Sequence, residues 1–268
     1  MYEAYWELGE PPFDNSPNPK FLYLSPEHEE ALARLTYAVT RRKGWAMLTG
    51  EYGCGKTTVS RTLVQRLDPE RYEVALLANP CWGATDFLRE ALYQLGMDVP
   101  ERGKPELVHA LNELFFRNYR AGRDTVVIID EAKLIDDDAI FEELRLLANF
   151  QTDDRFLVTI LLIGSSELRE KIRRIRHLDQ RVAIRHHLTP LDRDHTAHYI
   201  AHRLRTTGQT RALFTEEAVT LIFDFTRGTP REINNLCDLA LLTGYSKGSR
   251  EIDEHIVAEV IKDTVGVS

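Results

Sequence analysis

Two kinds of segment alternate along the first two thirds of the chain. Short apolar runs, such as VVII at 126–129, are separated by longer stretches in which apolar residues recur at every third or fourth position. The runs are typical of strands buried on both faces, and the longer stretches are typical of amphipathic helices. The pattern predicts strands at 45–49, 72–78, 125–130, 156–164 and, shorter, within 182–191, with helices at 57–67, 84–95, 105–119, 137–148 and 166–176.

The pattern changes at about residue 192, beyond which only helical periodicity remains. Alternating strands and helices imply a parallel sheet with helices on both faces, whereas consecutive helices imply a separate bundle. We therefore expect an α/β domain over residues 1–190, which includes an N-terminal extension, and a helical domain over residues 191–268. The four helices predicted in the second domain are 192–206, 215–226, 230–244 and 252–263.

The N-terminal segment, residues 1–26, is rich in proline and aromatic residues. We expect it to have little regular structure and to bury its large side chains against a neighbouring domain. The next helix is expected to begin at Pro26, because Ser25 can cap it and proline is favoured in the first turn.

A glycine-rich loop follows the first predicted strand. The sequence GEYGCGKT, residues 50–57, fits the pattern G-x-x-x-x-G-K-[ST] and lies between a predicted strand and a predicted helix, as that motif requires. Glycines let successive backbone N–H groups converge on anionic oxygens, and the helix start adds a partial positive charge. We expect Lys56 to bridge the outer phosphates of a nucleotide and the Thr57 hydroxyl to bind Mg²⁺. The candidate nucleotide-binding residues are Gly50, Glu51, Tyr52, Gly53, Cys54, Gly55, Lys56, Thr57 and Thr58.

Two adjacent acidic residues end the third predicted strand. Asp130 is expected to contact Mg²⁺ through water, and Glu131 to orient and deprotonate the attacking water. An ordinary strand end before an acidic helix would look the same in isolation, but the glycine-rich loop favours the catalytic interpretation. A glutamate here indicates hydrolysis of the nucleotide rather than binding alone.

Three further residues are candidates for contact with the phosphates. Ser165 ends the fourth strand and could sense the γ-phosphate, whereas Ser166 is expected to cap the next helix. Arg181 lies between a helix and a short strand, from where it could reach the nucleotide of a neighbouring subunit. Arg231 lies in the first turn of a helix, where the dipole disfavours a cation, and this misfit favours a role at the γ-phosphate.

Composition narrows the class of protein. The chain has 268 residues, of which 43% are hydrophobic and 28% charged, and its net charge of −8 argues against a globally basic nucleic-acid-binding protein. Its three cysteines are scattered and suit neither a disulfide framework nor a metal site. No apolar run approaches the roughly 20 residues of a membrane helix. We expect a cytoplasmic protein, with a peripheral position at the inner membrane as the alternative.

These motifs, in this order, resemble those of AAA+ ATPases of the general secretion pathway protein A (ExeA/GspA) type. The proline-rich and aromatic N-terminal signature is the most specific part of the resemblance, whereas the loop motif is general to P-loop ATPases. The matching stretches are PNPKFLYLSPEHEEALARL, LTGEYGCGKTT, VVIIDEAKLI, LLIGSSEL, LDQRVAIRHHLTPL and GTPREINNLCDLALL.

The resemblance implies a fold, ligands and partners. The fold is the α/β P-loop NTPase sheet of AAA+ proteins, flanked by helices and followed by a C-terminal helical lid. The ligands are ATP and Mg²⁺. The expected partners are further copies of the same chain, in a ring or filament with active sites between subunits, and a membrane-associated assembly protein.

Residue roles follow by matching the family's motifs. Lys56 and Thr57 belong to the Walker A motif, whereas Asp130 and Glu131 belong to the Walker B motif. Arg181 becomes the arginine finger, and Arg231 becomes the second sensor. The family's N-terminal stretch lies near the adenine, so the candidates for contact with the base are Phe21, Tyr23 and Leu24.

The chain departs from the family at two positions near the γ-phosphate. Lys133 stands where the family usually has glutamine, and Ser165-Ser166 stands where it has Gln-Pro, which leaves the first sensor unassigned. Secretion members also carry a membrane span and a peptidoglycan-binding region after the ATPase, so the chain is expected to be either a fragment or a stand-alone relative.

Three functions therefore remain open. The first is an oligomerising ATPase that drives assembly of a secretion or envelope complex. The second is a nucleic-acid-associated ATPase of the transposition-regulator type, which the basic residues at 41–43 and 169–176 favour. The third is a nucleotide-gated switch with negligible turnover.

Overall fold

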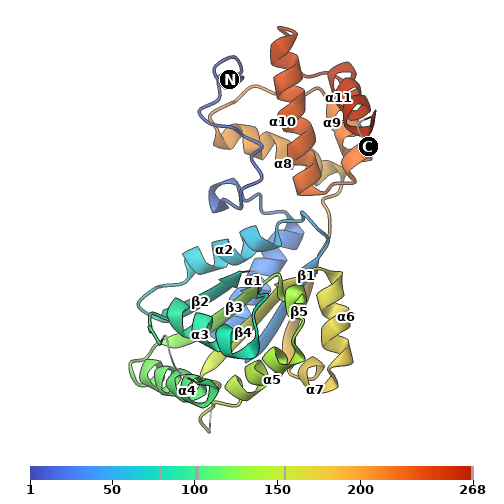
Figure 1. Ribbon diagram of the computed structural model, residues 1–268. Coiled ribbons are helices and arrows are strands. Elements are labelled where there is room, and N and C mark those ends of the chain that lie inside the picture. Colours follow the sequence, from blue (N-terminus) through green and yellow to red (C-terminus); the bar gives the residue numbers. More distant parts are fainter. Residues whose placement is uncertain (79, 100–102, 154, 267–268) are drawn as a thin grey trace. The chain divides into compact units, whose positions relative to one another are not determined.

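The computed structural model describes residues 1–78, 80–99, 103–153 and 155–266, and its chain forms two compact units (Figure 1). The α/β unit consists of Glu29–Glu51 and Val59–Leu188. The helical unit consists of Met1–His28, Tyr52–Thr58 and Thr189–Ser268. The glycine-rich loop thus groups with the helical unit, although it continues directly from a strand of the α/β unit.

A five-stranded parallel sheet forms the centre of the α/β unit, which confirms the predicted fold class. The strand order is β2-β3-β4-β1-β5, so β1 has a neighbour on each side and β4 separates it from β3. Every residue of β1 and of β4 is buried, as their continuous apolar runs predict. The strands are β1 (Trp45–Gly50), β2 (Tyr72–Ala78), β3 (Asp124–Asp130), β4 (Val158–Gly164) and β5 (Val182–Leu188).

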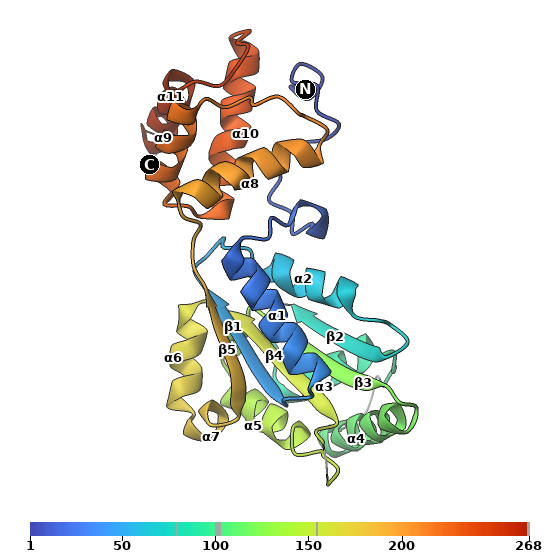
Figure 2. The same cartoon turned by 180° about the vertical axis from the view of Figure 1, so that it is seen from behind.

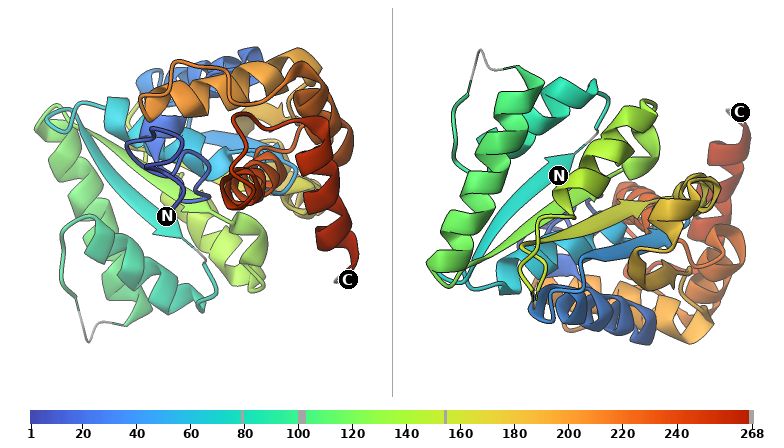
Figure 3. Two further views of the ribbon diagram at one scale, coloured as in Figure 1. Left: turned by 90° about the horizontal axis from the view of Figure 1, so that it is seen from above. Right: turned by 90° about the horizontal axis from the view of Figure 1, so that it is seen from below.

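Helices cover both faces of this sheet (Figures 2 and 3). Met47 of β1 joins a hydrophobic core with α3, α4, α5 and α6, whereas Leu48, one residue on, is buried on the face covered by α1 and α2. Each such side chain contributes about 1.5–3 kcal/mol through burial. The helices are α1 (Pro26–Thr40), α2 (Lys56–Arg66), α3 (Ala84–Gln94), α4 (Lys104–Arg120), α5 (Asp138–Leu147) and α6 (Ser166–Arg174).

The helix predicted over 166–176 is interrupted. Ile175 leaves the helical conformation, with φ −93° and ψ 78°, and a short helix α7 (Arg176–Asp179) follows. The break turns Leu178 into the core, where it is completely buried. Periodicity alone did not reveal this break, because no glycine or proline marks it.

The helical unit contains α8 (Arg193–Thr206), α9 (Glu216–Thr226), α10 (Pro230–Ser246) and α11 (Glu254–Gly266). The N-terminal segment belongs to this unit rather than to the α/β domain in which the sequence analysis placed it. Its Trp6 and Phe13 are buried in the core formed by α8–α11. The division between the two units therefore differs from the one expected, because the aromatic side chains of the segment form part of the hydrophobic core of α8–α11.

Specific hydrogen bonds hold the segment in place. The Trp6 indole Nε1 donates to the carbonyl oxygen of Leu241 over 2.9 Å. Arg203 of α8 is 5% exposed, and its guanidinium donates to the carbonyl oxygens of Pro12 and Asp14 over 2.5 and 2.6 Å. A buried guanidinium that satisfies backbone carbonyls fixes a segment that has no regular structure of its own.

Candidate functional site

The glycine-rich loop leaves the sheet at the carboxyl end of β1. A Cβ atom on Gly50 would lie 2.5 Å from the carbonyl oxygen of Leu188 in β5, so only glycine fits at the point where the loop begins. Gly53 and Gly55 have φ values of +79° and +91°, in the left-handed region that glycine adopts without strain. The loop ends at Lys56, where α2 begins.

The lysine of the motif is buried in this loop. Lys56 is 7% exposed, and its ammonium nitrogen lies 5.9 Å from the centre of the Tyr52 ring. Thr57 and Thr58 follow in the first turn of α2 and are partly exposed. A buried ammonium at the start of a helix, beside two partly exposed threonines, is suited to an anionic ligand.

Arg231 lies directly against the loop. It is the second residue of α10, and its backbone N–H donates to the carbonyl oxygen of Gly53 over 3.2 Å. A Cβ atom on Gly53 would lie only 2.7 Å from the Cβ atom of Arg231. The structure thus places the backbone of Arg231 at the loop and leaves its side chain exposed, and the role of its guanidinium at the γ-phosphate stays a prediction.

The acidic pair lies where β3 ends. Asp130 is the last residue of the strand, is 6% exposed, and accepts a hydrogen bond from the backbone N–H of Glu131 over 2.9 Å. Glu131 has φ 51° and ψ 38°, a left-handed conformation that is rare for a residue with a side chain. Its Oε2 atom is buried and has no hydrogen-bond partner among the described residues. Backbone strain and an unsatisfied carboxylate oxygen in one residue are typical of a functional site.

Strand order brings this acidic pair to the loop's edge of the sheet. In the parallel ladders, Ile129 of β3 pairs with Leu162 of β4, and Thr49 of β1 pairs with Gly164 of β4. The carboxyl ends of β1 and β3 therefore lie at the same edge, with β4 between them. Because neighbouring strands are about 4.8 Å apart, Gly50 and Asp130 are separated by about 10 Å across the sheet.

The two departures from the family pattern meet at one carboxylate. The Ser165 hydroxyl donates to Glu167 Oε2 over 3.3 Å, and the Lys133 ammonium lies 3.4 Å from the same oxygen.

Ser165, not Ser166, occupies the cap position of α6, although its side chain makes no capping hydrogen bond. Ser166 is instead the first helical residue, and its hydroxyl donates to Glu51 over 2.9 Å. The expectation that Ser166 caps the helix was therefore wrong, because Ser166 is already the first helical residue.

Arg181 lies at the other end of the sheet. It immediately precedes β5, a strand of seven residues that runs parallel to β1. At about 3.3 Å per residue, this places Arg181 about 20 Å from the edge at which the loop begins. Its side chain has no ion-pair partner in the part of the chain that the structure describes. This position suits contact with another molecule better than contact with the loop of the same chain.

Comparison with protein families identifies the fold. The family model described as an AAA domain matches residues 39–172, which is half of the chain. The chain belongs to the AAA domain family. The match contains the loop, the acidic pair and Ser165, whereas Arg181, Arg231 and the N-terminal segment lie outside it.

Individual relatives extend the comparison beyond the AAA domain. General secretion pathway protein A of Aeromonas hydrophila is 40% identical over 256 residues, which cover 94% of this chain and 46% of the relative. The chain thus spans about half the length of this relative, and the resemblance to the GspA type is confirmed.

Solved structures confirm the AAA+ fold. The Aeropyrum pernix ORC2 protein, in its ADPNP–ADP complexes, has a TM-score of 0.69 at 20% identity over 94% of this chain and 71% of its own. The Thermotoga maritima RuvB Holliday junction branch migration motor has a TM-score of 0.57 at 18% identity over 89% of this chain and 69% of its own.

The residues expected near the adenine of this AAA protein lie against α8. The Tyr23 hydroxyl is 2.8 Å from Nδ1 of His195, and its ring packs against Tyr199 and His202. Burial and the nearby Arg205 and Arg203 lower the pKa of His202. Phe21 is 6% exposed beneath the guanidinium of Arg203, so it supports the fold and is not available to a base. Tyr23 and Leu24 are partly exposed and remain predicted base contacts.

The sequence analysis overlooked one residue at the loop. His28 of α1 is 4% exposed, and its Nε2 atom lies 3.0 Å from the carbonyl oxygen of Cys54. His28 lies in the first turn of a helix, more than 20 positions before the motif. No known sequence motif links a histidine at this distance to a glycine-rich loop. The only hint was its place three residues after the predicted cap Ser25.

No helix in the described part of the chain is both long enough and apolar enough to cross a lipid bilayer.

Proposed function

We propose that this protein is an oligomerising ATPase that binds Mg-ATP at the glycine-rich loop and hydrolyses it at subunit interfaces. One observation carries the proposal: Glu131 has a strained backbone and a buried carboxylate oxygen without a partner among the described residues, at the sheet edge where the loop begins. Membership of the AAA domain family supports it.

The side chains of the loop and of the acidic pair fit Mg-ATP chemically. Backbone N–H groups of the loop and Lys56 would bind the phosphates, and the Thr57 hydroxyl and Asp130 carboxylate are oxygen ligands of the kind Mg²⁺ prefers. Mg²⁺ would neutralise charge on the phosphates when bound. Glu131 would accept a proton from the attacking water at Oε2, and Ser165 would contact the γ-phosphate.

Two arginines would complete the site. Arg231, which lies against the loop, would contact the γ-phosphate and report its presence to the helical unit. Arg181, at the opposite end of the sheet, would enter the site of a neighbouring copy and offset charge on the transferred phosphoryl group. This arrangement implies a homo-oligomeric ring or filament.

The work done by hydrolysis would be assembly of a secretion or envelope complex. The similarity to general secretion pathway protein A over 94% of this chain supports this role. A membrane-associated protein would be the assembly partner, and the ATPase would act in the cytoplasm or at the inner membrane surface.

Replacing Lys56 by alanine tests nucleotide binding. Loss of a charge-assisted contact to phosphate should weaken ATP binding by about 100-fold. Calorimetric titration of Mg-ATP into the purified chain measures the dissociation constant. Lys247→Ala is the matched control, because Lys247 is half-exposed in the helical unit and pairs with Glu259. Equal binding by wild type and Lys56→Ala would contradict the proposed site, as would absence of binding by wild type.

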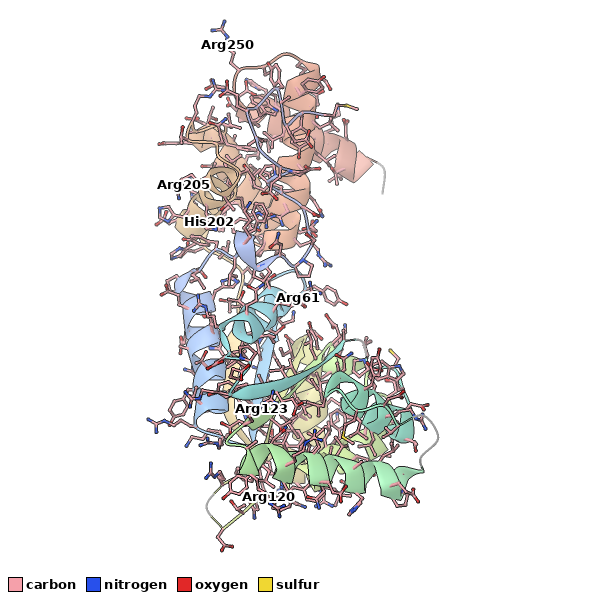
Figure 4. The ribbon with its side chains drawn as sticks, turned by 90° about the vertical axis from the view of Figure 1, so that its left-hand side faces the viewer. Arg61, Arg120, Arg123, His202, Arg205 and Arg250 are labelled. Atoms are coloured by element: carbon pink, nitrogen blue, oxygen red, sulfur yellow. The ribbon has the colours of Figure 1, made fainter. Side chains whose placement is uncertain are left out.

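A nucleic-acid-associated ATPase is a second candidate, and a basic hollow at the amino edge of the sheet favours it. Arg41, Arg42 and Lys43 precede β1, and Arg155 precedes β4. These four cations and the acidic Asp153 are among the residues that line a hollow of about 940 Å³. Arg120 and Arg123, which precede β3, lie at the same end of the unit (Figure 4). In a chain of net charge −8, this cluster is a local exception that suits phosphate groups.

Packing fixes two of these cations. Arg42 forms an ion pair with Asp124 over 2.7 Å, and the guanidinium of Arg155 lies 4.6 Å from the centre of the Tyr119 ring. Arginine heads held in this way lose little entropy when they bind a phosphate.

Removing Arg41 and Lys43 tests this second candidate. The double variant Arg41→Ala/Lys43→Ala should bind a fluorescent DNA duplex about 10-fold more weakly in the presence of ATP. The slope of log affinity against log salt concentration should become shallower by the equivalent of about two phosphate contacts. Fluorescence anisotropy across salt concentrations measures both. Arg250→Ala in the helical unit (Figure 4) is the control. No binding by wild type at low salt, or an equal loss in the control, would exclude this function.

A further inference from the structure

Two successive carbonyl groups of the glycine-rich loop are hydrogen-bonded within the helical unit. The carbonyl oxygen of Gly53 accepts from the backbone N–H of Arg231 over 3.2 Å. The carbonyl oxygen of Cys54 lies 3.0 Å from Nε2 of His28. Arg231 contributes a main-chain donor, but His28 acts through its side chain, so its contribution can be changed by mutation.

The hydrogen bonds of His28 indicate which ring nitrogen donates to the loop. A carbonyl oxygen only accepts, so Nε2 of His28 carries the hydrogen that it donates to Cys54. The other ring nitrogen, Nδ1, lies 2.6 Å from the hydroxyl of Ser25. The hydroxyl donates to Nδ1 when the ring is neutral, and this second bond fixes the ring orientation. Ser25 and His28 are 1% and 4% exposed, so packing also restricts their rotamers.

The glycines of the motif make this contact possible. A Cβ atom on Gly55 would lie 3.1 Å from Nε2 of His28 and would crowd the ring. Gly55 therefore serves two purposes, since it adopts a φ of +91° and also lets the imidazole approach the loop.

The contact determines which way a peptide group faces. In a planar trans peptide, the carbonyl of Cys54 and the N–H of Gly55 point in opposite directions. When His28 holds the carbonyl on one side, the Gly55 N–H is turned to the other. Loss of this hydrogen bond would remove one restraint on the peptide between Cys54 and Gly55, and glycine at position 55 permits conformations that other residues do not.

We propose that His28 is a positioning residue for the phosphate loop, which turns the Gly55 N–H toward bound phosphate, and that Ser25 fixes the orientation of the His28 ring. The inference rests on the proposed function, since it assumes that the loop binds the phosphates of ATP. It assigns the start of α1 a role in nucleotide affinity, because Ser25 directly precedes this helix and His28 lies in its first turn.

The test compares four variants of the full chain in calorimetric titrations with Mg-ATP. His28→Ala should bind about 10-fold more weakly, because the loop must pay for ordering one peptide on binding. His28→Gln should recover most of the affinity, since the glutamine amide can donate from nearly the position of Nε2. Ser25→Ala should have a smaller loss of about 3-fold, and His255→Ala, at an exposed histidine, should bind as wild type.

A second measurement observes the loop without nucleotide. The ¹⁵N–¹H resonance of Gly55 should be single and sharp in wild type and in His28→Gln, and it should broaden or double in His28→Ala as the peptide samples two orientations. A purely structural role of the imidazole would not be rescued by glutamine. If His28→Ala fails to fold, Ser25→Ala and His28→Gln still give a graded series.

The outcomes separate this inference from the proposed function. If wild type binds ATP and Lys56→Ala does not, unchanged affinity in His28→Ala overturns the role of His28 and leaves the ATPase standing. Equal losses in His28→Ala and His28→Gln also overturn it. If wild type does not bind ATP, the proposed function fails, and the Gly55 resonance still decides whether His28 orders the loop.

Discussion

Replacement of Glu131 by glutamine is expected to leave ATP binding intact and to lower the rate of phosphate release by about 10²- to 10⁴-fold, the usual contribution of a general base. Glutamine keeps the shape of the side chain and its ability to position water, but it cannot accept a proton. The Oε2 atom that would accept the proton of the attacking water is buried and lacks a partner among the described residues. The substitution therefore removes the group that is placed to accept this proton.

Two measurements on the same protein distinguish the possible outcomes. Calorimetry gives the affinity for Mg-ATP, and a phosphate-release assay gives turnover. Glu170→Gln serves as control, because Glu170 is exposed on α6 and pairs only with Arg173 among the described residues. Normal turnover in Glu131→Gln would show that the base lies elsewhere. Negligible turnover in wild type, with normal binding, would instead favour the nucleotide-gated switch.

Replacement of Arg181 by alanine should lower turnover by about 10³- to 10⁵-fold, the range known for an arginine supplied by a neighbouring molecule. Its position about 20 Å along β5 from the loop edge excludes a role within the same sheet's site. Turnover per subunit of the wild type should therefore rise with protein concentration, because each site would need a second copy.

Mixing two inactive variants provides the sharpest test of a shared site. Arg181→Ala subunits keep Glu131, and Glu131→Gln subunits keep Arg181. An interface therefore contains both groups when the first supplies the site and the second supplies the arginine. Random assembly of equal amounts should make about a quarter of the interfaces competent, as expected for head-to-tail contacts. Arg176→Ala is the control for removal of an exposed arginine nearby. No recovery of phosphate release in the mixture would count against a site shared by two copies.

The sequence predicted those parts of the molecule in which local pattern and local chemistry agree. The strands at Trp45–Gly50 and Val158–Gly164 are continuous apolar runs, and a sheet buried on both faces requires such runs. The loop at 50–57 and its place between a strand and a helix were recognisable from the spacing of its glycines and lysine, and its binding of phosphate stays a prediction. Asp130 and Glu131 were recognisable because they end a buried strand.

The remaining features depend on contacts between residues far apart in sequence. His28 meets the loop only because α1 and the loop come together in three dimensions, and no spacing rule connects positions 28 and 54. Lys133 and Ser165 share Glu167 for the same reason. The assignment of the N-terminal segment to the helical unit required knowledge of where Trp6 is buried, which composition does not provide.

The position of β5 has a consequence for how the protein can be divided. The AAA domain match ends at residue 172, before β5, yet β5 pairs with β1 along its whole length from Trp45 to Gly50. A fragment cut at the end of the match would expose the backbone of β1 along one side, and unpaired edges of this kind recruit strands from other molecules. The strand that leads into the glycine-rich loop would then become a site of aggregation, so a fragment for expression should extend past β5 and not end where the family match ends.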